Sequence, residues 1–318
     1  MGRLISVIVP VYNEAAGLCS FLEKELIPVL EKVDDSSEII VVNDGSSDNS
    51  AEYARRCAEE SEVPIRIVSF ARNFGKEVAL TAGIRQAKGN AVIMIDADGQ
   101  HPANEIPKMI EKWRAGAKIV TAVRARNTTK HAIGSKIYYK LMRMFGNRGA
   151  VEGEMDFRLL DRVVVDEFNK FTERNRITRG LINWLGFPQE YIKVRTKSRV
   201  AGKPSYNARK LMALAVDSMV SSSRTPLVFF GYVGLFIMLL SGVTGLFQLI
   251  QEYILKDPMH LEWGGGVAVS LFVAFLVGLV LISQAMTALY ISQIHAEAKN
   301  RPLYVIDKDN SMGIEDEK

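Results

Sequence analysis

Ala91-Val-Ile-Met-Ile-Asp-Ala-Asp-Gly-Gln100 is the most informative stretch of the sequence. Its apolar run ends in two carboxylates separated by one residue, which predicts a buried strand followed by a polar turn. Positions i and i+2 of an extended strand face the same way, so Asp96 and Asp98 are expected to point together. Two such oxygen ligands suit Mg²⁺ or Mn²⁺, but Asp and Gly are also ordinary turn residues. The pair alone therefore indicates either a metal site or a plain turn.

Strand and helix signals alternate on both sides of this stretch. Apolar, strand-like runs are predicted at Leu4–Val9, Glu38–Val42, Ile65–Ser69, Ala91–Ile95 and Lys118–Ala122. Helical patterns between them are predicted at Glu14–Val33, Ser50–Glu60, Glu77–Lys88 and Asn104–Ala115. Alternating βαβ units with fully buried strands predict an α/β domain around a mostly parallel sheet, with ligands at the carboxyl ends of the strands. Residues 124–198 are less regular and are expected to add helices and short antiparallel strands.

Two long apolar runs without charge follow this domain. Leu227–Ile250 has 24 residues and Val267–Ile291 has 25, whereas about 20 helical residues cross a bilayer. The connector Gln251–Gly264 holds three acids and one lysine, a net charge of −2, while the outer flanks are basic. The positive-inside tendency then puts both chain ends in the cytoplasm. A buried helical hairpin in a soluble protein is the alternative.

A further helix is predicted between the two regions. Apolar residues recur at helical spacing from Leu211 to Met219, which favours a helix on the membrane surface over a helix packed on the sheet. The expected organisation is an α/β domain over 1–205, this surface helix over 206–224, two transmembrane helices within 225–295 joined by an external loop 251–264, and a cytoplasmic tail over 296–318. The charged tail after Asp307 is predicted to be loosely held.

The charge of the chain limits its partners. A net charge of +4 and a pI near 8.9 are too mild to indicate nucleic acid. Arg124–Val151 and Lys193–Val216 each contain seven basic residues and no acid, which indicates either solvated faces or contact with phosphates and anionic lipids. The two cysteines, Cys19 and Cys57, are predicted to be ordinary small apolar residues in a reducing compartment.

Polar motifs close each of the first three predicted strands. They are Val9–Glu14 (VPVYNE), Val42–Asp48 (VNDGSSD) and the basic loop Arg72–Lys76 (RNFGK). The basic loop begins a helix and suits a phosphate. Asp48 and Ser50 are consistent with simple helix caps, but Asp44 falls at the same sheet edge as Asp96 and is a candidate ligand residue.

Taken in order, these motifs resemble those of glycosyltransferase family 2, which has the GT-A fold, and within it the dolichyl-phosphate mannose synthase branch. The resemblance extends along nearly the whole chain, through Asp156–Asp161 (DFRLLD), Glu173–Arg176 (ERNR), Trp184–Phe187 (WLGF) and Arg199–Lys203 (RVAGK). Asn300–Tyr304 (NRPLY) resembles the tail of bacterial polyprenyl-phosphate hexose transferases of the bactoprenol glucosyltransferase type.

The resemblance implies a role for each matching position. The nucleoside would be held by Pro10, Tyr12, Glu14 and Asp44. The divalent metal (Mg²⁺ or Mn²⁺) and the diphosphate would be held by Lys76, Asp96, Asp98 and Gln100. The acceptor side would be lined by Arg124, Arg126, Asp156, Arg158, Arg176, Arg199 and Lys203. Gly99 stands where the branch commonly has Leu, and His101 where it often has Asp. Pro204-Ser205 replaces a frequent Ser-Lys, so either Lys203 or Ser205 would take over the role of that lysine.

The implied reaction is inverting transfer of a hexose from a nucleotide-sugar to undecaprenyl or another polyprenyl phosphate, for cell-envelope glycan modification. UDP-glucose and UDP-N-acetylglucosamine are the leading donors by the same resemblance, and the family allows a tetramer. A phosphate nucleophile has a second pKa near 6 and is already ionised at neutral pH. Asp98 and Asp156 are the predicted catalytic residues. Asp156 would position the acceptor or metal, act as a base, or only pair with Arg158 or Arg176.

Other functional classes fit less of the sequence. A processive polysaccharide synthase would carry a Gln-x-x-Arg-Trp segment, which this chain lacks. A dinucleotide-dependent oxidoreductase would show a Gly-rich fingerprint after its first strand. A non-catalytic membrane scaffold or a sugar-lipid translocator remains the alternative from a different class, and nucleotide diphosphate release would separate it from an enzyme.

Overall fold

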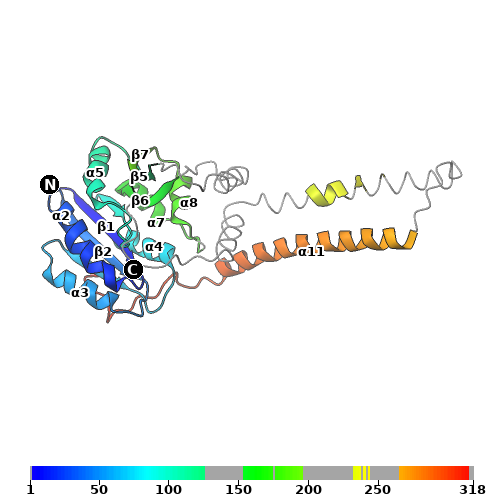
Figure 1. Ribbon diagram of the computed structural model, residues 1–318, viewed down its shortest axis with the longest axis horizontal. Coiled ribbons are helices and arrows are strands. Elements are labelled where there is room, and N and C mark those ends of the chain that lie inside the picture. Colours follow the sequence, from blue (N-terminus) through cyan, green and yellow to red (C-terminus); the bar gives the residue numbers. More distant parts are fainter. Residues whose placement is uncertain are drawn as a thin grey trace. The chain divides into compact units, whose positions relative to one another are not determined.

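The computed structural model describes residues 2–125, 153–174, 176–195, 232–237, 239–240, 243 and 265–314 (Figure 1). Four predicted site residues lie outside these ranges: Arg126, Arg199, Lys203 and Ser205. The surface helix 206–224 and the loop 251–264 also lie outside them. The chain forms two compact units, one of residues 1–139, 149–206 and 301–318, the other of residues 140–148 and 207–300.

A seven-stranded mixed sheet forms the centre of the first unit, in the order β3-β2-β1-β4-β6-β5-β7. The strands are β1 (Leu4–Val11), β2 (Ser36–Asn43), β3 (Ile65–Ser69), β4 (Ala91–Met94), β5 (Ile119–Arg124), β6 (Glu154–Asp161) and β7 (Gln189–Val194). Neighbours pair in parallel except at β6, which runs antiparallel to both β4 and β5. The predicted α/β domain with a mostly parallel sheet is therefore confirmed.

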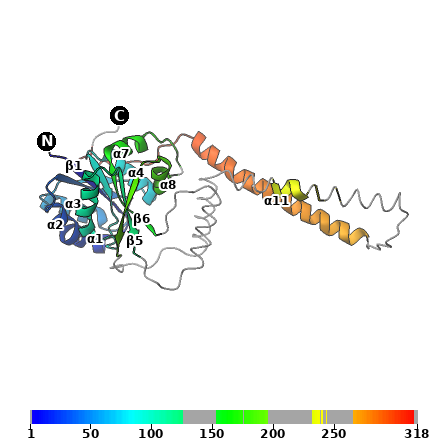
Figure 2. The same cartoon turned by 90° about the horizontal axis from the view of Figure 1, so that it is seen from above.

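Helices cover both faces of the sheet, because alternate residues of its buried strands point to opposite sides (Figure 2). One face carries α1 (Ala15–Phe21), the π-helical turn η1 (Leu22–Leu26), α2 (Ile27–Leu30), α3 (Ser50–Glu60), the 3₁₀ turn η2 (Ala103–Glu105) and α5 (Ile106–Arg114). The other carries α4 (Lys76–Gln86), α7 (Arg162–Asn169) and α8 (Thr178–Trp184). Both faces are apolar, so each strand reads as a continuous hydrophobic run.

The five strands and four helices expected in residues 4–122 are present, with ends shifted by a few residues. The long helix expected over Glu14–Val33 is a helical stretch interrupted by the π-helical turn. In the less regular region, β6 is antiparallel as expected, but β7 pairs in parallel with β5, which corrects the expectation of antiparallel strands there. A parallel return needs a long crossover, and α7 and α8 lie in it.

The end of the chain packs against the edge strand β3, which corrects the prediction of a loose tail. Ile67 and Met312 form an antiparallel bridge, as do Phe70 and Ile306. The Tyr304 ring stacks on Phe70 with centroids 5.0 Å apart, and its side chain is buried. An edge strand leaves a row of backbone donors and acceptors without partners, and the tail supplies them.

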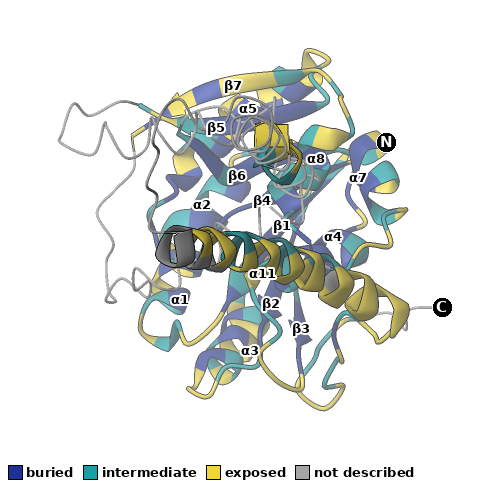
Figure 3. Ribbon diagram, turned by 90° about the vertical axis from the view of Figure 1, so that its right-hand side faces the viewer, coloured by how far each residue is buried: buried dark blue, intermediate teal, exposed yellow. Residues whose placement is uncertain are grey.

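The second unit contains one long helix in its described part, α11 (Gly265–Ala298). Within the described residues it is the one helix long and apolar enough to cross a membrane, over Phe275–Ala298. Most of its large apolar side chains are exposed (Figure 3). The helix predicted from Val267–Ile291 is thus present. Of the first predicted span, residues 232–237, 239–240 and 243 are described and are helical.

Candidate active site

A cavity of about 160 Å³ lies at the carboxyl ends of the central strands. Loops after β1, β2 and β4 and the first residue of α4 supply its walls. Its lining residues are Pro10, Val11, Tyr12, Glu14, Asp44, Lys76, Asp96, Ala97 and Asp98. The structure therefore brings together seven of the residues that the sequence singles out for the donor, and places them where a doubly wound sheet binds ligands.

Asp96 and Asp98 both reach this cavity, as expected for positions i and i+2 beyond a strand end. Gly99 follows in a left-handed conformation with φ of 71°, which turns the chain so that the Gln100 N–H donates to Asp98 Oδ1 at 3.0 Å. Gly99 therefore meets a conformational need that a branched residue would meet only with strain. Gln100 is half-buried next to the pair but is not among the lining residues.

His101 stabilises the turn that carries Asp96 and Asp98. Its Nδ1 accepts the Asp96 backbone N–H at 3.2 Å, and its ring stacks on Phe157 with centroids 5.6 Å apart. Burial lowers the pKa of His101, against the raising effect of Asp96. The imidazole is therefore neutral at pH 7, and with Nδ1 accepting, its proton lies on Nε2.

Lys76 is the central cation of the cavity. It is the first residue of α4 and follows Gly75, whose φ of 100° favours glycine. Its Nζ lies 2.7 Å from Asp96 and 3.1 Å from Asp156 Oδ2. Burial alone would lower the pKa of Lys76, but the two carboxylates outweigh it and raise the pKa. Lys76 thus stays charged and links β4 to β6.

Asp156 accepts from a second cation that the sequence did not identify. Arg179 in α8 donates to Asp156 Oδ1 at 2.8 Å. Burial would raise the pKa of Asp156, but Lys76 and Arg179 outweigh it and hold the pKa well below its ordinary value. The structural partners of Asp156 are therefore Lys76 and Arg179, and the alternative pairing with Arg158 or Arg176 is not observed among the described contacts.

Asp44 organises the basic loop beside the cavity. Its carboxylate is buried and accepts the N–H groups of Phe74 at 2.7 Å and Gly75 at 2.9 Å. Burial raises the pKa of Asp44, and these backbone hydrogen bonds partly offset the rise. A Cβ on Gly45 would lie 2.3 Å from the Arg72 carbonyl carbon, so only glycine permits this approach. Asp44 lines the cavity and also fixes the loop that positions Lys76.

The loops after β1 and β2 are joined by hydrogen bonds. The Asn13 N–H donates to Ser46 Oγ at 3.0 Å, and the Ser47 N–H donates to Asn13 Oδ1 at 2.8 Å. Asp48 accepts from Ser50 within its own loop and from the Ala15 N–H of α1 at 3.1 Å. Ser50 Oγ also accepts the Glu14 N–H at 3.0 Å. Asp48 and Ser50 are therefore more than local caps, because they join the loop after β2 to the loop that carries Tyr12 and Glu14.

The described arginines that the sequence assigned to the acceptor side differ in exposure: Arg158 and Arg176 are buried, and Arg124 is exposed. Arg158 is 1% exposed and pairs with Glu154 at 2.9 Å, and Arg176 is 4% exposed and donates to the carbonyls of Glu173 and Phe171. Neither lines the cavity, so their described contacts are structural. Arg124 is exposed at the end of β5. Basic residues that must be buried look the same in sequence as basic residues that bind phosphate.

The donor atoms of the cavity fit a hard divalent cation. Asp96 and Asp98 offer carboxylate oxygens, and no sulfur or imidazole is among its lining residues. Mg²⁺ and Mn²⁺ prefer this oxygen set. Asp96 and Asp98 are thus the residues that could hold such an ion, with Lys76 balancing part of their charge.

Comparison with known proteins places this geometry in a family. The profile of glycosyl transferase family 2 matches residues 6–168, from β1 into α7. The chain is 35% identical to an uncharacterized glycosyltransferase, YkcC, of Bacillus subtilis, covering 98% of this chain and 95% of that protein. It is also 35% identical to the SfII prophage-derived bactoprenol glucosyl transferase of Shigella flexneri, covering 96% and 98% of the two chains.

The structural comparison is more distant. Glucosyl-3-phosphoglycerate synthase from Mycobacterium tuberculosis, in complex with Mn²⁺, UDP-glucose and phosphoglyceric acid, shares 20% identity at a TM-score of 0.47, covering 69% of this chain and 78% of that chain. Likeness at that level says nothing about the donor or metal of the present protein. The family profile and the full-length relatives decide the matter: this chain belongs to glycosyl transferase family 2 and is a glycosyltransferase with a GT-A domain.

Proposed function

We propose that this enzyme transfers a hexose from UDP-glucose or UDP-N-acetylglucosamine to polyprenyl phosphate, with undecaprenyl phosphate as the bacterial acceptor. Four relatives that match over nearly their whole length are named bactoprenol glucosyl transferases. The motifs after the nucleotide half, which resemble the same branch, support this acceptor over a soluble one. The product would be a polyprenyl-phosphate sugar for cell-envelope glycans.

The cavity suits the charge that develops during transfer. The bond between the anomeric carbon and the diphosphate breaks as the acceptor attacks, so negative charge grows on the leaving diphosphate. Lys76 presents its ammonium group to the cavity from the first turn of α4. A preorganised cation stabilises such charge because no reorganisation is needed during reaction.

A divalent cation held by Asp96 and Asp98 would supply further charge neutralisation for the diphosphate. Gln100 would complete this side of the site, as the family resemblance implies. The carboxylate of Asp96 already touches Lys76 at 2.7 Å. The lysine therefore belongs to the same charge cluster that would receive the ion and the diphosphate.

Asp156 fits a positioning role better than a base. Its pKa is held low by Lys76 and Arg179, so the carboxylate has little affinity for a proton at neutral pH. A phosphate acceptor is already ionised near pH 7 and needs no proton removed. Asp156 would instead hold Lys76 and Arg179 at the junction of the donor and acceptor sides.

The position of the tail supports a membrane-spanning hairpin. Residues 304–312 pack on β3, which supports placing the tail and the GT-A domain on one side of a bilayer that the chain would cross. A single crossing by α11 would separate them. An even number of crossings satisfies the tail contacts, and the apolar run Leu227–Ile250 supplies a second. We propose that both chain ends and the catalytic domain are cytoplasmic in a plasma-membrane protein, with the predicted basic acceptor residues near the lipid headgroups.

The observation that carries the proposal is the convergence of Asp96, Asp98 and Lys76 in one cavity of a chain with full-length relatives named bactoprenol glucosyl transferases. The test uses full-length protein in detergent with undecaprenyl phosphate and Mg²⁺ or Mn²⁺, and a panel of radiolabelled nucleotide-sugars. Label extracted into organic solvent should appear with a UDP-hexose and depend on the lipid.

The matched variants are Asp98→Asn and Asp166→Asn. Asp98→Asn removes one cavity carboxylate and should abolish most lipid-linked label. Asp166 is an exposed acid on α7 that pairs with Arg162 away from the cavity lining, and its variant should keep full activity. Lipid-independent nucleotide release, or full transfer by Asp98→Asn, would refute the proposal.

A further inference from the structure

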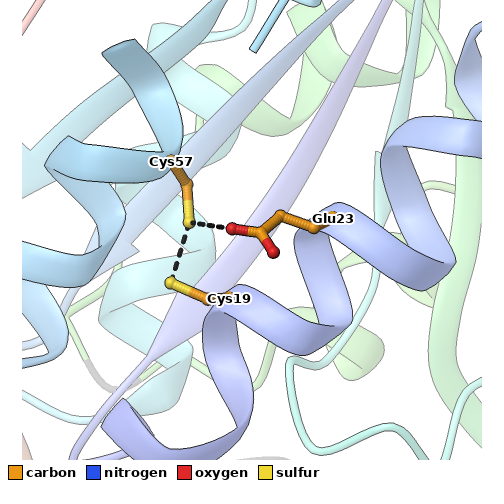
Figure 4. A group of neighbouring side chains, drawn as sticks. All are labelled: Cys19, Glu23 and Cys57. Carbon is orange, nitrogen blue, oxygen red and sulfur yellow. Dashed lines mark hydrogen bonds between the residues drawn. The ribbon is translucent and has the colours of Figure 1, made fainter. Parts of the chain in front are cut away.

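Three potential metal ligands meet on the face of the domain that carries α1 and α3 (Figure 4). Cys19 comes from α1, Glu23 from the π-helical turn that follows it, and Cys57 from α3. Cys57 Sγ lies 2.9 Å from Cys19 Sγ and 3.8 Å from Glu23 Oε1. The ligand atoms all lie within 4.8 Å of one another. Cys19 and Cys57 are the only two cysteines of the chain. Their side chains meet even though the two residues are 38 positions apart in the sequence.

The local fold explains how the three groups converge. Cys19 and Glu23 are four residues apart, so they project from the same side of one helical stretch. Leu22 begins a π-helical turn directly between them, and such turns shift side chains relative to a regular helix. Cys57 approaches from α3 on the opposite side. Cys57 is buried, Cys19 is half-buried and Glu23 is exposed, so the cluster opens to solvent on the Glu23 side.

We propose that Cys19, Glu23 and Cys57 form a site for Zn²⁺ or a similar thiophilic divalent cation. Cysteine thiolates and glutamate carboxylates are both zinc ligands, and three protein ligands leave the fourth tetrahedral position to water. Zn–S bonds of about 2.3 Å place two thiolates of a tetrahedral site about 3.8 Å apart. The sulfurs therefore separate by rotation of the cysteine side chains when the ion enters. Binding releases the two thiol protons to solvent.

The surroundings favour a cation over a disulfide. Glu23 has no part in a disulfide, but its carboxylate lies beside the two sulfurs, where it can share a cation with them. A nearby carboxylate opposes a thiolate but favours a metal ion. The site also differs from the Asp96–Asp98 pair, because its sulfur ligands select zinc-like ions while the oxygen pair selects Mg²⁺ or Mn²⁺.

An ion here would link α1 to α3. These helices begin just after the loops of Asn13 and Asp48, which already hydrogen-bond to each other beside the residues of the donor cavity. The proposed ion therefore acts as a second, structural link between the two helices. It takes no part in group transfer.

The test uses full-length protein in detergent, reduced and stripped with a chelator. Zn²⁺ is titrated, and bound metal is measured by plasma mass spectrometry after gel filtration. We expect one zinc per chain, proton release on binding, protection of both thiols from alkylation, and a higher unfolding temperature. Cd²⁺ should give the ultraviolet absorption of thiolate-to-metal charge transfer.

Three variants separate this site from the catalytic one. Cys57→Ser should lose zinc altogether. Glu23→Gln changes an exposed side chain, so it should fold normally and bind zinc at least about tenfold more weakly. Asp98→Asn should lose transferase activity and keep the zinc. Wild-type protein that binds no zinc overturns the proposal, as does binding that survives Cys57→Ser. Air oxidation to a Cys19–Cys57 disulfide without zinc binding would also overturn it, in favour of a redox-sensitive pair.

Discussion

Lys76 is the residue on which the charge balance of the donor cavity depends. It contacts a carboxylate just after β4 and another from β6, and no other lysine or arginine lines the cavity in the described part of the chain. Without Lys76, the carboxylates of Asp96 and Asp156 lose the cation that lies between them. The leaving diphosphate also loses one stabilising positive charge.

Lys76→Met should therefore lower kcat by about 10²- to 10³-fold, the usual cost of losing one preorganised charge-stabilising group. Transfer of labelled hexose to undecaprenyl phosphate measures it. Lys108→Met is the matched control, because Lys108 is an exposed lysine on α5 that pairs with Glu105. A Lys76→Met enzyme with wild-type kcat would exclude the lysine from catalysis.

Arg179 is expected to act through Asp156. Its guanidinium donates to the carboxylate at 2.8 Å, and Asp156 in turn contacts Lys76. Arg179→Ala and Asp156→Asn should each slow transfer, and the double variant should be no slower than Asp156→Asn alone, because groups that act as a unit are non-additive. Steady-state kinetics of the four enzymes measure the coupling. Multiplicative losses would show that the two residues act independently.

Residue by residue, the sequence predicted the donor side better than the acceptor side. Asp44, Lys76, Asp96 and Asp98 follow strand ends, and parallel strands bring their carboxyl ends to one edge. Arg179 and His101 gave no such signal, because their role depends on α8 and on the turn after β4. Arg158 looked like a binding residue, yet its partner Glu154 lies on the same strand and is buried with it.

Among the elements, the tail contributes directly to the sheet. Ser69 at the end of β3 donates through Oγ to the Asn310 carbonyl at 2.8 Å and receives a hydrogen bond from the Asp307 N–H at 2.8 Å. The tail also reaches the loop before α4, where the Ala71 N–H donates to the Val305 carbonyl at 3.0 Å. The segment that follows α11 thus braces the loop that leads into α4 and Lys76.

Tyr304→Ala should destabilise the GT-A domain by about 2–4 kcal/mol, because it removes a buried ring that stacks on Phe70. Thermal unfolding of full-length protein and protease cleavage within the tail measure this. Tyr304→Phe keeps the stacked ring and is the control. An unchanged unfolding temperature in Tyr304→Ala would mean that the tail contributes nothing to stability.

Asp161 ties three elements together. One oxygen accepts the Val163 N–H at the start of α7, and the other accepts Trp113 Nε1 of α5 at 2.8 Å. Burial would raise the pKa of Asp161, but these hydrogen bonds and Lys118 outweigh it, so the folded-state pKa is lowered. Its stabilisation is therefore complete above the unfolded pKa near 4 and is lost as pH falls through the lower folded value.

Asp161→Asn should consequently lower the free energy of unfolding by about 1–2 kcal/mol at pH 7. The difference from wild type should shrink as pH falls below about 4. Denaturant unfolding monitored by the fluorescence of Trp113 and the other tryptophans measures it at several pH values. A difference that stayed constant with pH would contradict the role of the ionised carboxylate.

Helices and strands were predicted correctly where their hydrophobic residues recur in a clear pattern. Strands buried on both faces gave continuous apolar runs, and α3 was found with its observed ends. The prediction for the tail was wrong because the tail binds β3 through backbone groups and one aromatic ring. Its charged residues instead indicated a segment exposed to solvent. The π-helical turn has no composition signal, since it depends on the packing of α1 against its neighbours.

At the scale of the whole molecule, the tail constrains the topology. The proposed hairpin returns it to the side of the GT-A domain, so the hairpin predicts Asp257 of the connector outside and Asp309 inside. In cells expressing the Cys19→Ser, Cys57→Ser background, Asp257→Cys should react with a membrane-impermeant maleimide, and Asp309→Cys should react only after permeabilisation. Labelling of both from outside would rule out the hairpin.

The bridges between β3 and the tail also bear on the order in which the sheet is completed. Residues 304–312 leave the ribosome after the two apolar runs, so β3 has β2 on one side but no partner on its outer edge until then. A newly made GT-A domain therefore keeps an open edge at β3 while the apolar runs are synthesised. Chains that stall before insertion would expose that edge to one another, so quality control of this enzyme would begin at β3.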